Sequence, residues 1–320
     1  MHNLSPITVK TSSSSLSTDL YRKVPELKLL ANIDVKVLMN KDSSSMRVED
    51  WKEIGDVIHK NYEKYNGFVV VHGTDTMVFT AAALSFMLKN LRKPVVLTGS
   101  QRPLSEIRSD ARRNLINAVD IASKGIVREV VVFFDRALLR GNRAVKVSID
   151  DYCAFDSPNY PWLAEVGLEI KVRSNLLFSS KSSRLRYCHD FDPRVLFIKV
   201  FPSIDLTPFI VAIKAKAFRG VIIEAFGAGN LPSGDKSFKE LLRSCRESEV
   251  PVVIVSQAHQ GRVRLDLYEA GAASLKMNAI SGNDITSEAA IVKMMKLLGE
   301  EVSYESFSRK FLTSISGEIS

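Results

Sequence analysis

The stretch "FVVVHGTDTMVFTAAALSFML", from Phe68 to Leu88, decides the fold of this chain. It opens with a continuous apolar run, breaks at the small and polar residues Gly73 to Thr76, and continues as a second apolar run. The β-branched first run predicts a buried strand, and the Ala- and Leu-rich segment 76–90 predicts a helix. A strand that passes directly into a helix is the building unit of an α/β fold.

The same alternation recurs along the first half of the chain. Its apolar runs are continuous, which is typical of parallel strands covered on both faces of a sheet. A hairpin is expected at 136–150, with its turn at Gly141 and Asn142. The other expected strands are 35–39, 68–73, 94–100 and 129–134, and the expected helices are 47–65, 76–90 and 110–123.

A polar, aperiodic stretch at 175–194 separates this region from a second one and is interpreted as a linker. The alternation then resumes, with strands expected at 195–200, 220–226 and 251–258, helices at 207–218 and 235–248, and three further helical segments. We therefore predict an α/β protein. A large N-terminal domain (1–174), with a mostly parallel sheet and helices on both faces, is followed by a smaller C-terminal α/β domain (195–320).

The composition is that of a globular protein, with 45% hydrophobic and 25% charged residues. The three cysteines are scattered and form neither a disulfide framework nor a zinc motif, so a reducing, cytoplasmic compartment is expected. Lys and Arg exceed Asp and Glu by 44 − 36 = 8. The basic clusters 108–114 and 181–186 lack interleaved aromatics, which favours solvated surface over nucleic-acid binding. No apolar run approaches the roughly 18 residues of a membrane span.

In open α/β sheets, ligands bind beyond the carboxyl ends of the strands. The residues expected there are hydroxyl, carboxylate, amide or glycine, and His72 is the one potential metal ligand or ordinary base among them. Such a set suits a small zwitterion, because helix N-termini attract carboxylates and an aspartate can hold an ammonium group. The segments are Asp42–Ser43–Ser44, Gly73–Thr74–Asp75, Thr98–Gly99–Ser100–Gln101 and Gly227–Ala228–Gly229–Asn230.

Two interpretations of Thr74 and Asp75 stand side by side. Thr and Asp are favoured helix N-caps, and the helix expected from Thr76 needs a cap. Lys146 also has two interpretations: a lysine between apolar strand residues usually lies on the exposed face of its strand. If it points inward instead, burial makes it a better base, and a threonine hydroxyl needs such a base to become a nucleophile. Thr74, Lys146 and Asp75 would then form a nucleophile–base–orienter set.

Several motifs together resemble the bacterial-type L-asparaginases, and within them the cytosolic type I group. The resemblance rests on "HGTDTM" and "TGSQRP" with their flanks, and it extends from about Ser5 to the C-terminus. The other segments that carry it are "VLMNKDSSSM" (37–46), "FFDRALLRGNRAVK" (133–146), "AFDSPNYPWL" (154–163), "GVIIEAFGAGNLP" (220–232) and "ISGNDITSEAAIVK" (280–293).

The resemblance implies hydrolysis of L-asparagine to L-aspartate and ammonia without a metal or organic cofactor. It implies that Thr74 and Lys146 form a nucleophile–base arm and that Asp75 holds the substrate ammonium. Ser43, with its neighbours Asp42 and Ser44, would hold the α-carboxylate. Asn230 would complete the site of a neighbouring subunit, in a homodimer or a dimer of dimers.

The sequence departs from the family pattern in one respect. The family begins with a strand that ends in Thr-Gly-Gly-Thr, and its first threonine is the nucleophile usually credited with forming the acyl-enzyme. The printed sequence does not contain this motif, so we expect the chain to be an N-terminally incomplete asparaginase. Two alternatives are an inactive relative that binds asparagine or aspartate, and the asparaginase-like subunit of a tRNA amidotransferase.

Overall fold

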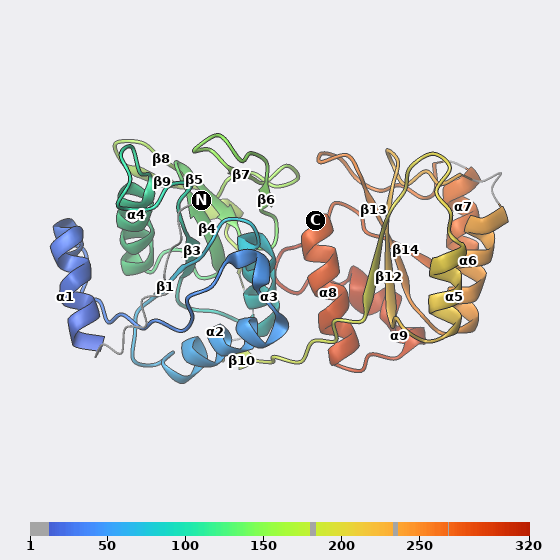
Figure 1. The fold of residues 1–320 in the computed structure, drawn as a ribbon, viewed down its shortest axis with the longest axis horizontal. Coiled ribbons are helices and arrows are strands. Elements are labelled where there is room, and N and C mark those ends of the chain that lie inside the picture. The colour runs from blue at the N-terminus through green and yellow to red at the C-terminus, as the bar shows by residue number, and fades with distance from the viewer. Residues whose placement is uncertain (1–12, 180–183, 233–235, 268) are drawn as a thin grey trace, which may run out of the picture.

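A computed structural model describes residues 13–179, 184–232, 236–267 and 269–320 (Figure 1). Residues 1–12 of the predicted first domain, 180–183 of the predicted linker and Asp235 of a predicted helix lie outside these ranges. The described chain forms two α/β units, as the sequence predicts.

The N-terminal unit contains a mixed six-stranded sheet with the order β1-β3-β4-β5-β8-β9. The strands β1, β3 and β4 run parallel to one another, and β4, β5, β8 and β9 pair antiparallel. The bounds are β1 (Phe68–Val71), β3 (Val95–Thr98), β4 (Val130–Phe134), β5 (Ala137–Arg140), β8 (Ala164–Val166) and β9 (Ile170–Val172).

Helices cover both faces of this sheet. Val95 and Leu97 pack against the helix α3, whereas Val96 between them packs against α4, because successive strand residues point to opposite faces. A peripheral segment with α1 and η1 packs its Val24 and Leu27 against Val119 of α4. The helices of this unit are α1 (Ser13–Lys23), η1 (Pro25–Leu29), η2 (Ser43–Ser45), α2 (Val48–Lys60), α3 (Met77–Met87), α4 (Ala111–Lys124) and η3 (Ser174–Leu176).

The C-terminal unit has a four-stranded parallel sheet with the order β11-β12-β13-β14. One face packs against α5 and α6, and the other packs against α8. The elements are β11 (Val195–Lys199), α5 (Thr207–Lys214), β12 (Gly220–Ala225), α6 (Lys236–Glu247), β13 (Val252–Ser256), α7 (Glu269–Lys276), β14 (Ala279–Ser281), α8 (Ser287–Gly299) and α9 (Tyr304–Leu312).

The two units share one hydrophobic core. The helices α3 and α8 face each other at the junction (Figure 1) and contact each other extensively. The buried core there is continuous from α2 through α3 and α8 to Phe311 of α9. The α3 helix is therefore buried on almost every side, which explains why its sequence is apolar all round.

Two predicted elements are wrong. The segment 35–39 contains no strand, and its Val37 is 60% exposed. This segment pairs with no strand of the sheet. Among the described strands, β1 therefore lies at the end of the sheet and pairs with β3 alone. Apolar alternation can predict a strand, but a strand forms only where a neighbouring backbone supplies the other half of the hydrogen bonds.

The predicted hairpin at 136–150 is the second error. Its two halves do not pair with each other: β5 turns back on β4, and β6 (Val145–Lys146) pairs with β7 (Phe155–Asp156). The reversal between β4 and β5 is made by Asp135, whose φ of 54° allows the tight turn. The predicted linker also contains β10 (Arg186–Tyr187), which pairs with β2 (Leu88–Lys89), a strand at the end of the predicted α3 helix.

Candidate functional site

Thr74 and Asp75 lie in the short connection between β1 and α3. The N-cap position of α3 is Thr76, whose side chain makes no capping bond and donates instead to the carbonyl oxygen of Ser43 at 2.6 Å. The capping interpretation of Thr74 and Asp75 is therefore wrong, and both side chains are available to other groups. They project beyond the carboxyl end of β1, where α/β sheets hold their ligands.

Lys146, on the strand β6 (Val145–Lys146), contacts both of these residues. Its Nζ donates to Thr74 Oγ1 at 2.9 Å and to Asp75 Oδ1 at 2.6 Å. The Lys146 side chain is 17% exposed and that of Asp75 is 61% exposed. Lys146 thus points into the site rather than to solvent, and the three residues of the predicted nucleophile–base–orienter set meet in space.

The loop with Asp42, Ser43 and Ser44 closes one side of this site. Asp42 caps η2 by accepting from the backbone N–H of Ser44 at 2.8 Å, and these bonds hold the pKa of the Asp42 carboxyl below its usual value. Ser43 is buried. Gly73 allows its close approach, because a Cβ at that position would lie 2.6 Å from Ser43 Oγ.

His72 precedes the site but does not act on Thr74. Its Nδ1 lies 2.7 Å from the carbonyl oxygen of Gly73, and its Nε2 lies 2.9 Å from Thr80 Oγ1. A carbonyl can only accept, so Nδ1 carries the proton and Nε2 accepts from the Thr80 hydroxyl. Burial lowers the pKa of the His72 ring, which keeps it neutral near pH 7. Its role here is to tie the end of β1 to α3.

A buried aspartate organises the loop that follows β3, and sequence reasoning missed it. The Asp110 carboxylate accepts from the backbone N–H groups of Gln101 and Arg102 at 3.0–3.1 Å. The Gln101 side chain in turn donates to the carbonyl oxygens of Ile149 and Asp151, which lie on the loop after Lys146. Asp110 stands at the start of a predicted helix, where an aspartate normally predicts an N-cap. Nothing in that pattern indicates that its carboxylate binds the loop after β3.

Asn230 lies in the other unit, after β12. Its backbone bonds with that of Phe226 in a tight turn, in which the N–H of each residue donates to the carbonyl of the other. Among the hydrogen bonds of the described residues, none joins Asn230 to Thr74, Asp75 or Lys146. The structure of one chain therefore gathers six of the seven predicted site residues around η2, the β1–α3 connection and β6, and leaves Asn230 apart.

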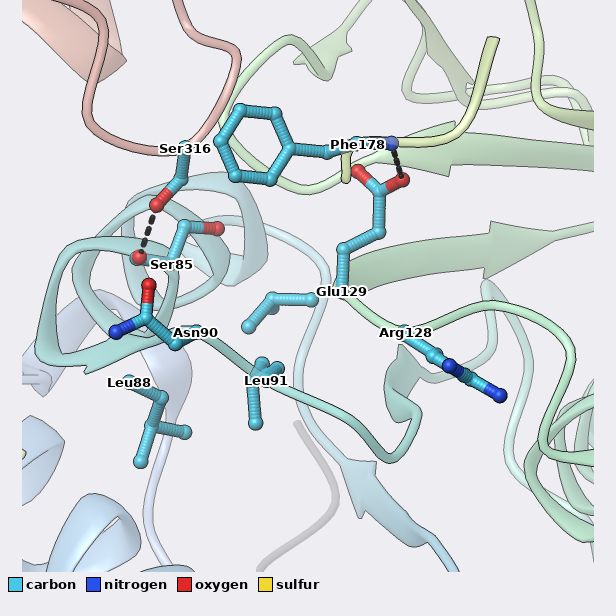
Figure 2. Close-up of a pocket in the computed structure, with 9 residues that line it drawn as sticks. Ser85, Leu88, Asn90, Leu91, Arg128, Glu129, Phe178 and Ser316 are labelled. Carbon is cyan, nitrogen blue, oxygen red and sulfur yellow. Dashed lines mark hydrogen bonds between the residues drawn. The ribbon is translucent and has the colours of Figure 1, made fainter. Parts of the chain in front are cut away.

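A small pocket lies at the opposite end of the sheet, beside the start of β4 and the end of α3 (Figure 2). Its volume of about 20 Å³ accommodates roughly one water molecule and no amino acid. Glu129 on its wall is bonded to Arg140 and to the backbone N–H of Phe178. This cavity is consequently a packing feature rather than a second substrate site.

The described ranges contain neither a metal-binding cluster nor a membrane-spanning helix. Within them, no cluster of three His, Cys, Asp or Glu side chains is arranged to hold a metal ion. The helices of the described part of the chain include none that is both long and apolar enough to cross a bilayer.

Comparison with known proteins identifies the class. Residues 6–178 match the family described as "Asparaginase, N-terminal", and residues 194–311 match "Glutaminase/Asparaginase C-terminal domain". The two matches cover both structural units, so the chain belongs to the L-asparaginase family.

Individual relatives place it within that family. L-asparaginase 1 of Escherichia coli (strain K12) is 37% identical over 279 residues, which are 87% of this chain and 82% of the relative. The crystal structure of L-asparaginase I from Vibrio cholerae superposes with a TM-score of 0.86 at 35% identity, over 98% of this chain and 96% of that one. The chain is thus similar to relatives named L-asparaginase 1 or L-asparaginase I. It also shares 34% identity with a Glutamyl-tRNA(Gln) amidotransferase subunit of Pyrococcus abyssi, over 94% of this chain and 70% of the relative.

Proposed function

We propose that this protein hydrolyses L-asparagine to L-aspartate and ammonia. The observation that carries the proposal is the position of Lys146 Nζ, within hydrogen-bond distance of both Thr74 Oγ1 and Asp75 Oδ1. A lysine, a threonine and an aspartate in direct contact can activate a hydroxyl without histidine or metal. The family membership and the similarity to E. coli L-asparaginase 1 support amide hydrolysis as the reaction.

The substrate would bind as a zwitterion between the β1–α3 connection and the η2 loop. The exposed Asp75 carboxylate is suited to the α-ammonium group, since a charge-assisted hydrogen bond is stronger than a neutral one. The Ser43 hydroxyl and its neighbours Asp42 and Ser44 lie beside Gly73 and would hold the α-carboxylate. This leaves the side-chain amide of asparagine facing Thr74.

In the proposed chemistry Lys146 is the general base and Thr74 is the nucleophile. Lys146 takes the proton of the Thr74 hydroxyl, and the oxygen attacks the amide carbon to form a tetrahedral intermediate. The resulting Lys146 ammonium gives its proton to the leaving nitrogen, the C–N bond breaks and ammonia departs. Water then hydrolyses the ester and releases L-aspartate.

We further propose that the complete active site contains one more strand beside β1, with the Thr-Gly-Gly-Thr motif of the family. Among the described strands β1 pairs on one side, with β3, and this supports the proposal because an end strand leaves backbone groups that another strand can bond. Val71 at the end of β1 is 71% exposed, next to the site. The intact mass and N-terminal peptide of the protein from its source cells test this proposal: a product without that motif would contradict it.

Mutation of the pair tests the function. Either Thr74→Ala or Lys146→Met should lower kcat for L-asparagine by about 10²- to 10⁴-fold, and the double variant should lose little more, because the two groups act as a unit. The matched control is Lys124→Met, which removes a lysine paired with Asp120 at 2.7 Å on the surface of α4. Additive losses in the double variant would refute the paired role, and inactivity of a protein that carries the Thr-Gly-Gly-Thr strand would refute the function.

We also propose a cytoplasmic homodimer or dimer of dimers, in which Asn230 of a neighbouring subunit completes the site. Apolar side chains next to the site support an interface there: Ile107 is 87% exposed and Ile149 is 78% exposed, on two loops that Gln101 joins. Size-exclusion chromatography with light scattering should give a multiple of the 35.6 kDa chain mass. A monomer at micromolar concentration would contradict the proposal.

One alternative function has a specific observation in its favour. The similarity to the amidotransferase subunit of Pyrococcus abyssi covers almost the whole of this chain. A tRNA-dependent role would show as salt-sensitive binding of tRNA, because phosphate contacts release counterions. A purely amino-acid-binding role would show as calorimetric binding of L-asparagine without ammonia release.

A further inference from the structure

The last residues of the described chain, Ser314 to Ser320, run between the two units and are buried from Gly317 to Ile319. Glu318 is fully buried and Ile319 is 9% exposed. The segment has no regular secondary structure, and it is held both by bonds within itself and by bonds to other parts of the chain. Its contacts fall into two sets: one around Arg143 and one around Glu318.

The first set holds the turn that leads into β6. Arg143 is 1% exposed, and its Nε donates to the Gly317 carbonyl at 2.8 Å while its Nη2 donates to Ser320 Oγ at 3.0 Å. Asn142 donates to the Ser316 carbonyl at 3.1 Å. The Arg143 guanidinium also forms an ion pair with Asp284 of the C-terminal unit at 3.1 Å.

The second set anchors the segment itself. The Glu318 carboxylate binds the ammonium of Lys293 on α8 and accepts from the backbone N–H groups of Ile315 and Ser316 at 2.8 Å. The Ser316 hydroxyl donates to the carbonyl oxygen of Ser85 on α3 at 2.7 Å (Figure 2). The segment is thus fixed to α8, and it touches both elements that carry the site: α3, which follows Thr74, and the turn that precedes Lys146.

Lys146 is held outside the main sheet, by the pairing of β6 with β7 and by the bonds of Gln101 to the loop that follows. It lies on the two-residue strand β6, which belongs to a sheet of two strands, β6 and β7, and not to the main sheet. Arg143, three residues before Lys146, and its neighbour Asn142 are buried side chains that tie this turn to the rest of the molecule. The anchorage of the turn matters for a catalytic group, because a shift of about 1 Å in such a group can cost about 10²-fold in rate.

We propose that Arg143 is a positioning residue for Lys146, and that the segment 314–320 is the latch that holds Arg143 in place across the junction. The Lys146–Thr74 geometry then depends on the packing of the C-terminal unit against the N-terminal one. This inference rests on the proposed function for its kinetic consequence, but its structural part can be measured separately.

Two variants loosen the latch without removing a buried charge. Gly317→Ala introduces a Cβ that would lie 2.5 Å from Arg140 Nη1, at a residue with a φ of +83°. Arg143→Lys keeps the positive charge beside Asp284 but loses the planar guanidinium group, whose N–H groups bond both Gly317 and Ser320. The matched control is Gly125→Ala, at the end of α4. Gly125 has a φ of +64°, so the alanine carries a comparable backbone strain, but the added Cβ would have no neighbour within 4 Å.

The readout that does not depend on activity is trace acetylation of lysines by acetic anhydride, measured by mass spectrometry. We expect the acetylation rate of Lys146, relative to the exposed Lys52, to rise several-fold in both latch variants and to stay unchanged in Gly125→Ala. On L-asparagine, both latch variants should lose about 10- to 100-fold in kcat with little change in KM, because the groups proposed to bind the substrate are not displaced.

The outcomes separate the inference from the proposed function. An unchanged Lys146 to Lys52 ratio in a folded latch variant overturns the inference, whatever the activity. A wild-type protein without asparaginase activity, combined with a raised ratio in the variants, overturns the proposed function and leaves the latch standing. If circular dichroism shows that neither variant folds, Ser316→Ala replaces them, since it removes only the hydrogen bond from the Ser316 hydroxyl to Ser85. A raised Lys146 to Lys52 acetylation ratio in this variant supports the inference, and an unchanged ratio overturns it.

Discussion

Breaking the buried ion pair between Lys293 and Glu318 should destabilise the protein strongly. Both side chains are 0% exposed, and burial lowers the pKa of Lys293 while the Glu318 carboxylate opposes that effect. Glu318→Gln leaves the lysine without its counter-charge and offers one acceptor oxygen where the carboxylate used two. Removing one partner of a buried pair costs about 3–5 kcal/mol, so we expect a loss of that size in the free energy of unfolding.

The assay is a double-mutant cycle of Glu318→Gln and Lys293→Met, followed by denaturant unfolding. Lys293→Met should cost less than Glu318→Gln, since the carboxylate keeps its backbone donors from Ile315 and Ser316. The double variant should fall short of the sum of the single losses by about 1–3 kcal/mol. The control is Asp120→Asn, which breaks an exposed pair with Lys124 and should cost about 0.5 kcal/mol or less. Single losses below about 1 kcal/mol that simply add would refute the reasoning.

Three further predictions follow from single contacts. Gly73→Ala should weaken L-asparagine binding, seen as a raised KM, because its Cβ would displace Ser43 Oγ, and an unchanged KM would contradict this. The pKa of Asp192 is lowered to about 2, chiefly by hydrogen bonds from Arg194, so its contribution of about 2 kcal/mol is present above pH 4 and lost as the pH falls toward 2. The stability of Asp192→Asn, measured by thermal unfolding, should not show that loss at acid pH. If the wild type and the variant lose stability in parallel as the pH falls, the prediction is contradicted. Burial raises the pKa of the Cys245 thiol to about 12, so Cys245 should react with a thiol reagent only after unfolding, whereas rapid native labelling would show that it is accessible.

The β1–α3 connection shows what local sequence can predict. Its apolar runs and the polar break between them determine a strand, a turn and a helix, because each element follows from the residues within it. The rule that ligands lie beyond the carboxyl ends of parallel strands then identifies Thr74 and Asp75 from the strand alone. The two-domain α/β architecture follows in the same way, from the repeated alternation of strand and helix patterns.

Long-range pairing was beyond those rules. The segment 35–39 has the residues of a strand but no ladder partner, and the expected hairpin at 136–150 is divided between two sheets. Whether an apolar run becomes a strand, and which neighbour it pairs with, depends on backbone that lies far away in the sequence.

The sequence by itself determined which residue types stand at the strand ends, and hence the kind of ligand they suit. Only the tertiary structure decided that Lys146, 72 residues from Thr74, turns inward to meet it. It likewise decided that Asp110 anchors a loop and that Arg143 meets Gly317 and Ser320 at the junction. The physical reason is that the direction of a side chain on a two-residue strand is decided by its surroundings, and for Lys146 these include Thr74 and Asp75, which lie far away in the sequence.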